Sequence, residues 1–195
     1  RLGSVTRGFA PAQRLEKARV VIIRVCRPDR CAPWFMDAMR SVLDRQPNAE
    51  LWIVGESGCS AGRVRFLGAR SDVADLLRQA DIFAYAPSPD SGSHDVCVLE
   101  AMACGLPSAL TDVPAVNGSV HSGQQGLLAP FGNVEAFAAA VDRLIEDESL
   151  RSRLGREARM RAEKEFSLGR LASAYLTAYN DALEAPPPRT APSGR

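Results

Sequence analysis

The stretch DIFAYAPSPDSGSHDVCVLEAMACGLPSALTD, residues 81–112, contains a complete strand, helix and strand unit. The apolar run at 81–86 predicts a first strand, and the run at 106–112 predicts a second. Between them the pattern predicts a helix over 94–104 that ends at Gly105. Two strands joined through a helix lie parallel in one sheet, so this stretch predicts an α/β fold.

The same alternation of apolar runs and helical segments continues along most of the chain. Further strands are expected at 19–25, 50–56, 63–68 and 126–130, and further helices at about 32–46, 71–79 and 114–120. Three consecutive helices follow the last strand, and Asn133, Ser149 and Ser167 are expected as their N-caps. The chain therefore predicts a Rossmann-like, doubly wound parallel sheet with a C-terminal helical extension. Such sheets bind ligands outside the carboxyl ends of their strands.

The chain is expected to divide into three parts. Residues 1–18 are polar and begin with Arg1 rather than methionine, which favours the remnant of an interdomain linker in a longer protein. Residues 19–184 are expected to form the folded domain with its C-terminal helices. Residues 185–195 are rich in proline and arginine and are expected to be a disordered tail.

Charge and composition favour some functions over others. The net charge of +1 gives no overall field that attracts nucleic acid, so no nucleic-acid partner is expected. The apolar runs are shorter than the ~20 residues of a membrane-spanning helix. Five cysteines without a C-x-x-C pair favour reduced, buried thiols in the cytoplasm. Two histidines and scattered cysteines form no metal-ligand pattern, and no metal site is expected.

The helix expected at 94–104 carries a carboxylate, Glu100, one turn after Val96 and at the edge of an apolar face formed with Leu99 and Ala103. One interpretation is a surface glutamate at the margin of burial. The other is a binding role, because the preceding loop APSPDSGSHD follows a strand end and leads into a helix N-terminus. Free N–H groups and the positive end of the helix dipole attract phosphate at such a position.

Two stretches carry a resemblance to a known family. SGSHDVCVLEAMACGLPSALTDV (91–113) and GQQGLLAPFGNVEAFAAAVDRLIEDESLRSRLGREAR (123–159) resemble the donor-binding half of a GT-B glycosyltransferase of the large retaining group called family 4. The similarity extends from about Val20 to Phe166. It implies that the intact enzyme transfers a sugar from a nucleoside diphosphate sugar (NDP-sugar) to an acceptor, with retention and without an essential metal or other cofactor.

The resemblance also implies what this chain lacks. The acceptor site and the usual catalytic histidine of the family belong to an N-terminal domain that is missing here, so no catalytic residue is assigned. The chain is expected to bind the donor without turning it over. Apolar surface left by the missing domain predicts some self-association. Peripheral association with the inner face of the membrane is a further expectation for the full-length protein.

The resemblance assigns donor-binding roles around the helix at 94–104. Glu100 matches the second of two family glutamates eight positions apart, which accepts hydrogen bonds from the ribose hydroxyls. Gly92 stands at the first, which contacts the transferred sugar, and Asp90 or Asp95 is a nearby carboxylate that a shift of the loop would bring there. The diphosphate is expected on the backbone amides of Ser93, His94, Asp95 and Val96. Asp95 has an alternative role as the helix N-cap.

Cations for the diphosphate are expected in IIRVCRPDRCAPW (22–34), which resembles a family segment with an arginine followed by a lysine. Arg24 matches the arginine, Arg30 stands where the lysine is usual, and Arg27 lies between them. A guanidinium can bind two phosphate oxygens where an ammonium acts as a point charge. The alternative is that arginine simply replaces lysine throughout this lysine-poor chain. Gly68 ranks lower, because the family loop that follows it passes beneath the base with mostly backbone contacts.

Three positions depart from the family pattern. They are Gly92, Ile23 at the glycine before the arginine, and PAVNG (114–118) at a Gly-Gly-x-x-Glu segment. Either the donor is unusual or catalysis has been lost. The main alternative function is therefore a catalytically inactive GT-B-like interaction or regulatory module. A less favoured alternative is a sugar-nucleotide epimerase, which shares the architecture.

Overall fold

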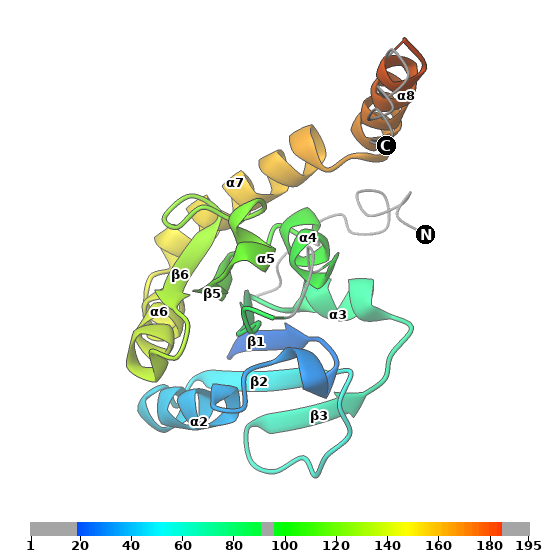
Figure 1. Ribbon diagram of the computed structural model, residues 1–195. Helices are drawn as coiled ribbons and strands as arrows, with labels where there is room; N and C mark the ends of the chain where they lie inside the picture. Colours follow the sequence, from blue (N-terminus) through cyan, green and yellow to red (C-terminus); the bar gives the residue numbers. More distant parts are fainter. Residues whose placement is uncertain (1–18, 91–95, 185–195) are drawn as a thin grey trace, which may run out of the picture.

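The computed structural model describes residues 19–90 and 96–184, and a six-stranded parallel sheet lies at its centre (Figure 1). The strands are β1 (Val20–Val25), β2 (Ala49–Val54), β3 (Val64–Gly68), β4 (Ile82–Tyr85), β5 (Ser108–Asp112) and β6 (Gly126–Pro130). Their order is β3-β2-β1-β4-β5-β6, and every neighbouring pair is parallel. The predicted doubly wound sheet is confirmed, and the direction of winding reverses between β1 and β4.

Helices cover both faces of the sheet (Figure 1). One face packs against α2 (Phe35–Arg45) and α6 (Val134–Glu146), and the other against α3 (Val73–Gln79), α4 (Val96–Ala103) and α5 (Pro114–Asn117). In β1, Ile22 belongs to the first core cluster and Val21 and Ile23 to the second. Because side chains alternate along a strand, the continuous apolar runs of this sequence are what a sheet buried on both faces requires.

The C-terminal extension consists of α6 followed by α7 (Glu148–Glu165) and α8 (Leu168–Glu184). Asn133 caps α6 as expected, and its Oδ1 accepts from the Ala136 N–H at 2.9 Å. The expected cap of α7 is wrong. Only Asp147 separates α6 from α7, and its Oδ1 accepts from the Leu150 N–H at 2.8 Å, so Ser149 falls inside the first turn. Ser167 directly precedes α8, and its carbonyl accepts from Leu171 N–H at 3.1 Å.

The packed face of α4 differs in part from the expected one. Its most deeply buried side chains are those of Val98, Ala101 and Met102, together with Ala103, whereas Val96 is 42% exposed. The helix lies between the sheet and α7, so apolar residues are needed on two sides. A single apolar face is therefore poorly defined in this sequence, and Val96 is left at the outer end.

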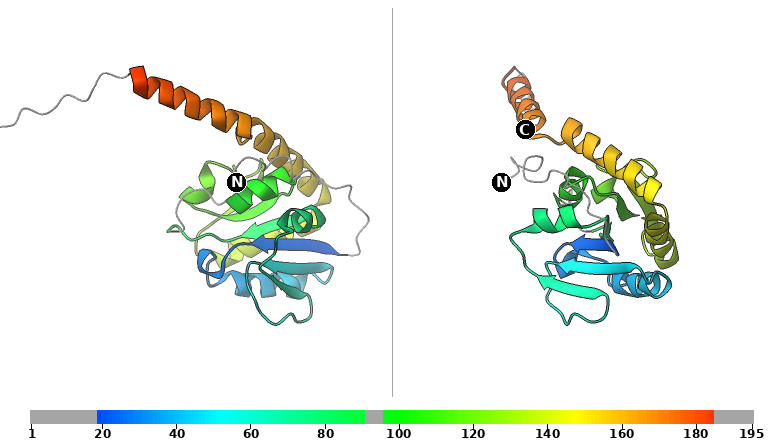
Figure 2. Two further views of the ribbon diagram at one scale, coloured as in Figure 1. Left: turned by 90° about the vertical axis from the view of Figure 1, so that its right-hand side faces the viewer. Right: turned by 180° about the vertical axis from the view of Figure 1, so that it is seen from behind.

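Helix α8 extends away from the sheet (Figure 2). It exposes Leu168, Leu171, Tyr175, Leu176, Tyr179 and Leu183, which recur at helical spacing. The expected self-association would use such a face and stays a prediction. No helix in the described part of the chain has the length and apolar character needed to span a membrane.

Candidate functional site

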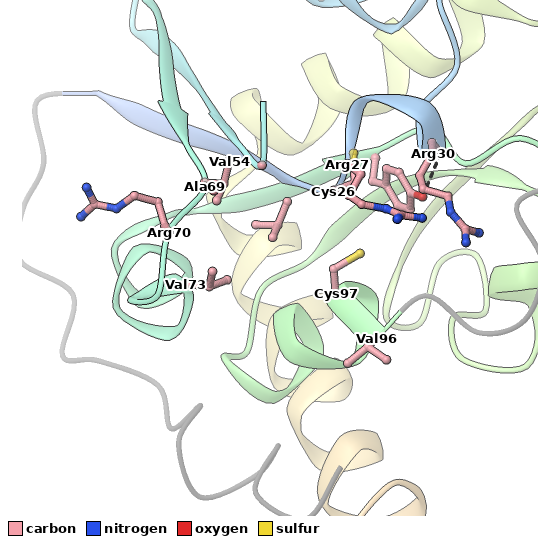
Figure 3. Close-up of a pocket in the computed structure, with 12 residues that line it drawn as sticks. Cys26, Arg27, Arg30, Val54, Ala69, Arg70, Val73, Val96 and Cys97 are labelled. Atoms are coloured by element: carbon pink, nitrogen blue, oxygen red, sulfur yellow. Dashed lines mark hydrogen bonds between the residues drawn. The ribbon is translucent and has the colours of Figure 1, made fainter. Parts of the chain in front are cut away.

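A pocket of about 490 Å³ opens at the carboxyl ends of the strands, where the sheet reverses its winding (Figure 3). It is lined by Val25, Cys26, Arg27, Arg30, Val54, Gly55, Ala69, Arg70, Val73, Tyr85, Val96 and Cys97. These residues come from the ends of β1, β2 and β4, from the loops that follow β1, β2 and β3, and from the first turns of α3 and α4. This is the location that the fold predicted for a ligand.

Gly55 makes the close approach of the β1 and β2 ends possible. Its φ is +93°, and a Cβ built on it would lie 2.3 Å from the Cys26 carbonyl oxygen. Any side chain there would push the two strand ends apart and distort the pocket wall. The sequence analysis missed this residue, although a glycine directly after a buried strand is a signal for such an approach.

Arg30 is held on the pocket wall by a short turn. The 3-10 turn Pro28–Arg30 follows β1, and the Arg30 N–H donates to the Arg27 carbonyl at 3.1 Å. The Tyr85 hydroxyl on β4 donates to the Arg30 carbonyl at 2.9 Å. The structure thus brings Arg30 to the pocket wall with Arg27, the middle arginine of the same segment, beside it (Figure 3).

Arg24 lies behind this wall and not on it. Its side chain is 4% exposed, packs over the Phe35 ring on the α2 face of the sheet and donates from Nη2 to Glu56 Oε2. Its Nε has no hydrogen-bond partner in the described structure. Burial lowers the pKa of Arg24, but the interactions with Cys26, Cys31 and Glu56 outweigh burial and raise that pKa above its ordinary value. Arg24 is therefore a buried, permanently charged group next to the site.

Glu100 lies on the same side of α4 as the pocket residues Val96 and Cys97, because residues three and four apart share a helix face. It is half-buried, and the described residues offer its carboxylate no hydrogen-bond or ion-pair partner. Burial alone raises the pKa of Glu100 above its ordinary value. A half-buried carboxylate with no protein partner fits a group that binds a ligand better than one that stabilises the fold.

We expect the Glu100→Gln variant to be more stable than the natural protein at pH 7. The folded protein holds the Glu100 proton to a higher pH than the unfolded chain, so stability falls as pH rises from about 4.5 through the raised pKa. Glutamine removes that cost of burying a charge. Urea unfolding at pH 7 and at pH 4 measures the difference in the free energy of unfolding between the variant and the natural protein. This difference should be smaller at pH 4. An equal difference at both pH values would contradict the burial of a charge as its cause.

The other predicted residues fall into two groups. Gly68 ends β3 with φ +63°, accepts from the Gly55 N–H at 2.8 Å and directs the next residues, Ala69 and Arg70, into the pocket lining. Val96 lines the pocket. The remaining candidates, Gly92, Ser93, His94 and Asp95, lie outside the described residues.

The cysteines are less buried than expected. Cys104 is buried, but Cys59 is exposed and Cys26, Cys31 and Cys97 are partly exposed. Cys26, directly after β1, and Cys97 in the first turn of α4 line the pocket (Figure 3). Within residues 19–90 and 96–184, no group of three or more histidine, cysteine, aspartate or glutamate side chains is placed to hold a metal ion.

Comparison with known proteins decides the family. The model of the family described as glycosyl transferases group 1 matches residues 18–147. The chain belongs to this group 1 glycosyltransferase family. The match covers the sheet, the pocket and α6, so the predicted GT-B glycosyltransferase domain is confirmed.

Individual proteins related to this glycosyltransferase domain support the same family assignment. It is 33% identical over 121 residues to the N-acetyl-alpha-D-glucosaminyl L-malate synthase of Bacillus anthracis, a match that covers 62% of this chain and 31% of the relative. It is 31% identical over 166 residues to the phosphatidyl-myo-inositol mannosyltransferase of Mycobacterium tuberculosis (strain H37Rv), with 74% of this chain and 44% of the relative covered. The chain thus spans less than half the length of these relatives.

Solved structures share the fold. A sucrose-phosphate synthase from Thermosynechococcus elongatus superposes with a TM-score of 0.77 at 20% identity, covering 93% of this chain and 51% of that one. Anabaena HepE, solved in complex with UDP and glucose, superposes with a TM-score of 0.72 at 20% identity, covering 84% and 48%. This glycosyltransferase domain thus corresponds to about half of the chain of each of these two proteins.

Proposed function

We propose that this chain is the NDP-sugar-binding domain of a retaining glycosyltransferase that needs no essential metal. One observation carries the proposal: the pocket at the strand ends places Arg30 and Arg27 on one wall and the first turn of α4 on another. A nucleoside diphosphate needs cations and free N–H groups for its phosphates and a hydrogen-bond acceptor for its ribose. The HepE structure with UDP and glucose supports a uridine nucleotide as one candidate ligand.

In this proposal the diphosphate lies between Arg30 and the N-terminus of α4. Val96 and Cys97, the first two residues of that helix, line the pocket, so the positive end of the helix dipole faces it. When the bond between sugar and diphosphate breaks, negative charge develops on the leaving phosphate. Arg30 would stabilise that charge, whereas the buried guanidinium of Arg24 behind the wall is already paired with Glu56.

Glu100 would hold the ribose. Its two carboxylate oxygens can each accept a hydrogen bond from a hydroxyl of the ribose diol. The carboxylate would not have to break another interaction first, because no described residue forms a hydrogen bond or an ion pair with it. The acceptor site and the residues that complete catalysis would come from the remainder of a longer protein, since this chain matches less than half of its relatives.

Replacing Arg30 by alanine tests the proposal. We expect the variant to bind a nucleoside diphosphate about tenfold more weakly, because it loses a charge-assisted hydrogen bond to phosphate. Binding of the corresponding nucleoside, which has no phosphate, should change little. Calorimetric titration of the natural protein and the variant measures both affinities.

Arg40→Ala is the matched control for this experiment. Arg40 is an exposed arginine on α2 that pairs with Asp37 at 2.7 Å and does not line the pocket. Its loss should leave nucleotide affinity unchanged. If Arg30→Ala binds the diphosphate as tightly as Arg40→Ala does, Arg30 is not a diphosphate ligand.

A further inference from the structure

Carboxylates pair with several arginines around the pocket. Arg27 pairs with Asp29 at 3.5 Å and Arg70 pairs with Asp72 at 2.6 Å, and all four side chains are exposed. Water and salt screen charges on the surface. These two pairs therefore change the electrostatic potential inside the pocket little.

A third pair, between Arg24 and Glu56, is largely shielded from solvent. The side chain of Arg24 is 4% exposed and that of Glu56 is 31% exposed, and Arg24 Nη2 donates to Glu56 Oε2. A charge that water screens poorly acts over a longer distance than one on the surface. The charge of Glu56 is therefore felt in the neighbouring pocket more than the charges of the carboxylates on the surface.

This pair adjoins the pocket on two strands. Arg24 directly precedes Val25, Glu56 directly follows Gly55, and both Val25 and Gly55 line the pocket. The Glu56 carbonyl also accepts from the Gly68 N–H at 3.2 Å, which fixes the backbone of Glu56 between the ends of β2 and β3. The negative charge of Glu56 is thus held in a constant place beside the pocket.

The stability of the fold does not by itself require the Arg24–Glu56 pair. Replacing a buried ion pair by apolar groups often leaves the free energy of unfolding unchanged or raises it. A diphosphate, in contrast, would bind more tightly to a pocket that has an unpaired Arg24 behind its wall. Glu56 therefore lowers the affinity of the pocket for anions, and this effect grows with the charge of the anion.

The donor and the product of a glycosyl transfer differ in charge at neutral pH. The diphosphate of an NDP-sugar is esterified at both ends and carries about two negative charges. The released NDP ends in a free phosphate with a second pKa of about 6, so it carries about three. A negative charge beside the pocket therefore disfavours the product more than it disfavours the donor.

We propose that Glu56 is a specificity-determining residue of the donor site, whose carboxylate offsets the charge of Arg24 and shifts the preference of the pocket from the product NDP toward the donor NDP-sugar. This inference rests on the proposed function, because it requires the diphosphate to lie in this pocket. Arg30 and Glu100 would not provide such discrimination, since the diphosphate and the ribose are common to donor and product.

Replacing Glu56 by glutamine tests this role. Glutamine has the same shape and its Oε1 can still accept from Arg24, so the variant removes the charge and keeps the contact. We expect about tenfold tighter binding of UDP, about fivefold tighter binding of UDP-glucose and no change for uridine, because the gain in affinity grows with the charge of the ligand. Calorimetric titration measures the three affinities, and the gains should shrink at high ionic strength. The corresponding guanosine and adenosine ligands are titrated in parallel.

Glu163→Gln is the matched control for this experiment. Glu163 lies on α7 and pairs with Arg159 at 2.6 Å, and no residue of that helix is among the described residues that line the pocket. Its replacement should leave all three affinities unchanged. Ser57→Asp is a second variant, which adds a carboxylate at the exposed position next to Glu56. It should weaken the binding of UDP more than that of UDP-glucose, and it tests the same charge effect if Glu56→Gln does not fold.

Changes that follow the charge of the ligand, with opposite signs in Glu56→Gln and Ser57→Asp, would support the proposal. The proposal is overturned, while the donor site stands, if Glu56→Gln binds UDP no more tightly than Glu163→Gln does. It is also overturned if Glu56→Gln changes the affinities for UDP, UDP-glucose and uridine by the same factor. If no nucleotide binds to the folded natural protein, the donor site itself is overturned, and the role of Glu56 falls with it.

Discussion

Replacing Gly155 by alanine should lower the free energy of unfolding by about 3 kcal/mol, because it forces an extra methyl group into a closed contact. Gly155 lies in the middle of α7, where the helix packs against the turn after α4. A Cβ built on it would lie 2.3 Å from the Gly105 carbonyl oxygen and 3.4 Å from Pro107 Cδ. Both contacts involve rigid groups, a backbone carbonyl and a proline ring, so no side-chain rotation relieves them.

The surrounding hydrogen bonds explain why the turn cannot move away. Gly105 has φ +74°, and the Leu106 N–H donates to the Ala101 carbonyl at 3.0 Å, which closes the end of α4. Arg159 of α7 donates to the Ala103 carbonyl in the same turn. Moving α7 outward to fit the methyl group would stretch this bond and open the second core cluster around Ala158 and Ala162.

Gly169→Ala is the matched control, because a Cβ added at Gly169 in α8 meets no atom within 4 Å apart from its chain neighbours and the adjoining backbone of its own helix. It should stabilise the protein slightly or leave it unchanged, since alanine is favoured over glycine in helices by up to about 1 kcal/mol. Urea unfolding with circular dichroism compares both variants with the natural protein. Equal stability of Gly155→Ala and Gly169→Ala would contradict the packing described for α7.

Replacing Glu100 by alanine should weaken binding of a nucleoside diphosphate about 100-fold, because the ribose loses both of its hydrogen bonds to a charged acceptor. The loss should appear with little cost in stability, since the carboxylate has no partner among the described residues and its burial raises its pKa. Calorimetric titration gives the two affinities directly.

A 2′,3′-dideoxynucleoside diphosphate separates a ribose contact from a general effect. The natural protein should bind the dideoxy ligand about as weakly as Glu100→Ala binds the ordinary nucleotide, and the variant should scarcely distinguish the two ligands. Such non-additivity is the signature of a direct interaction. If Glu100→Ala weakens both ligands by the same factor, Glu100 acts on the pocket in some other way.

The fold could be predicted from this sequence because its strands are short apolar runs separated by helical segments. Val21, Ile22 and Ile23 are apolar on successive positions, as a strand buried on both faces requires, and β1 is present at almost the predicted bounds. The cap of α7 could not be chosen from residue type alone. Asp147 and Ser149 are both good caps, and only the abrupt step from α6 to α7 selects the aspartate.

The site was predictable only in part, since a position near a strand end does not fix the direction of a side chain. Arg24 and Arg30 both follow from the strand-end segment, yet Arg24 alternates with Val25 and points to the α2 face, while the turn brings Arg30 into the pocket.

The most direct test of the donor site is a calorimetric titration of the reduced, folded chain with UDP, GDP and ADP. We expect one of the three to bind with one-to-one stoichiometry in the pocket that Arg30 lines, with its ribose reaching Glu100, which would also identify the base of the donor. No binding of any of them to protein whose circular dichroism shows a folded domain would contradict the donor site, and a role as an interaction module would then be favoured.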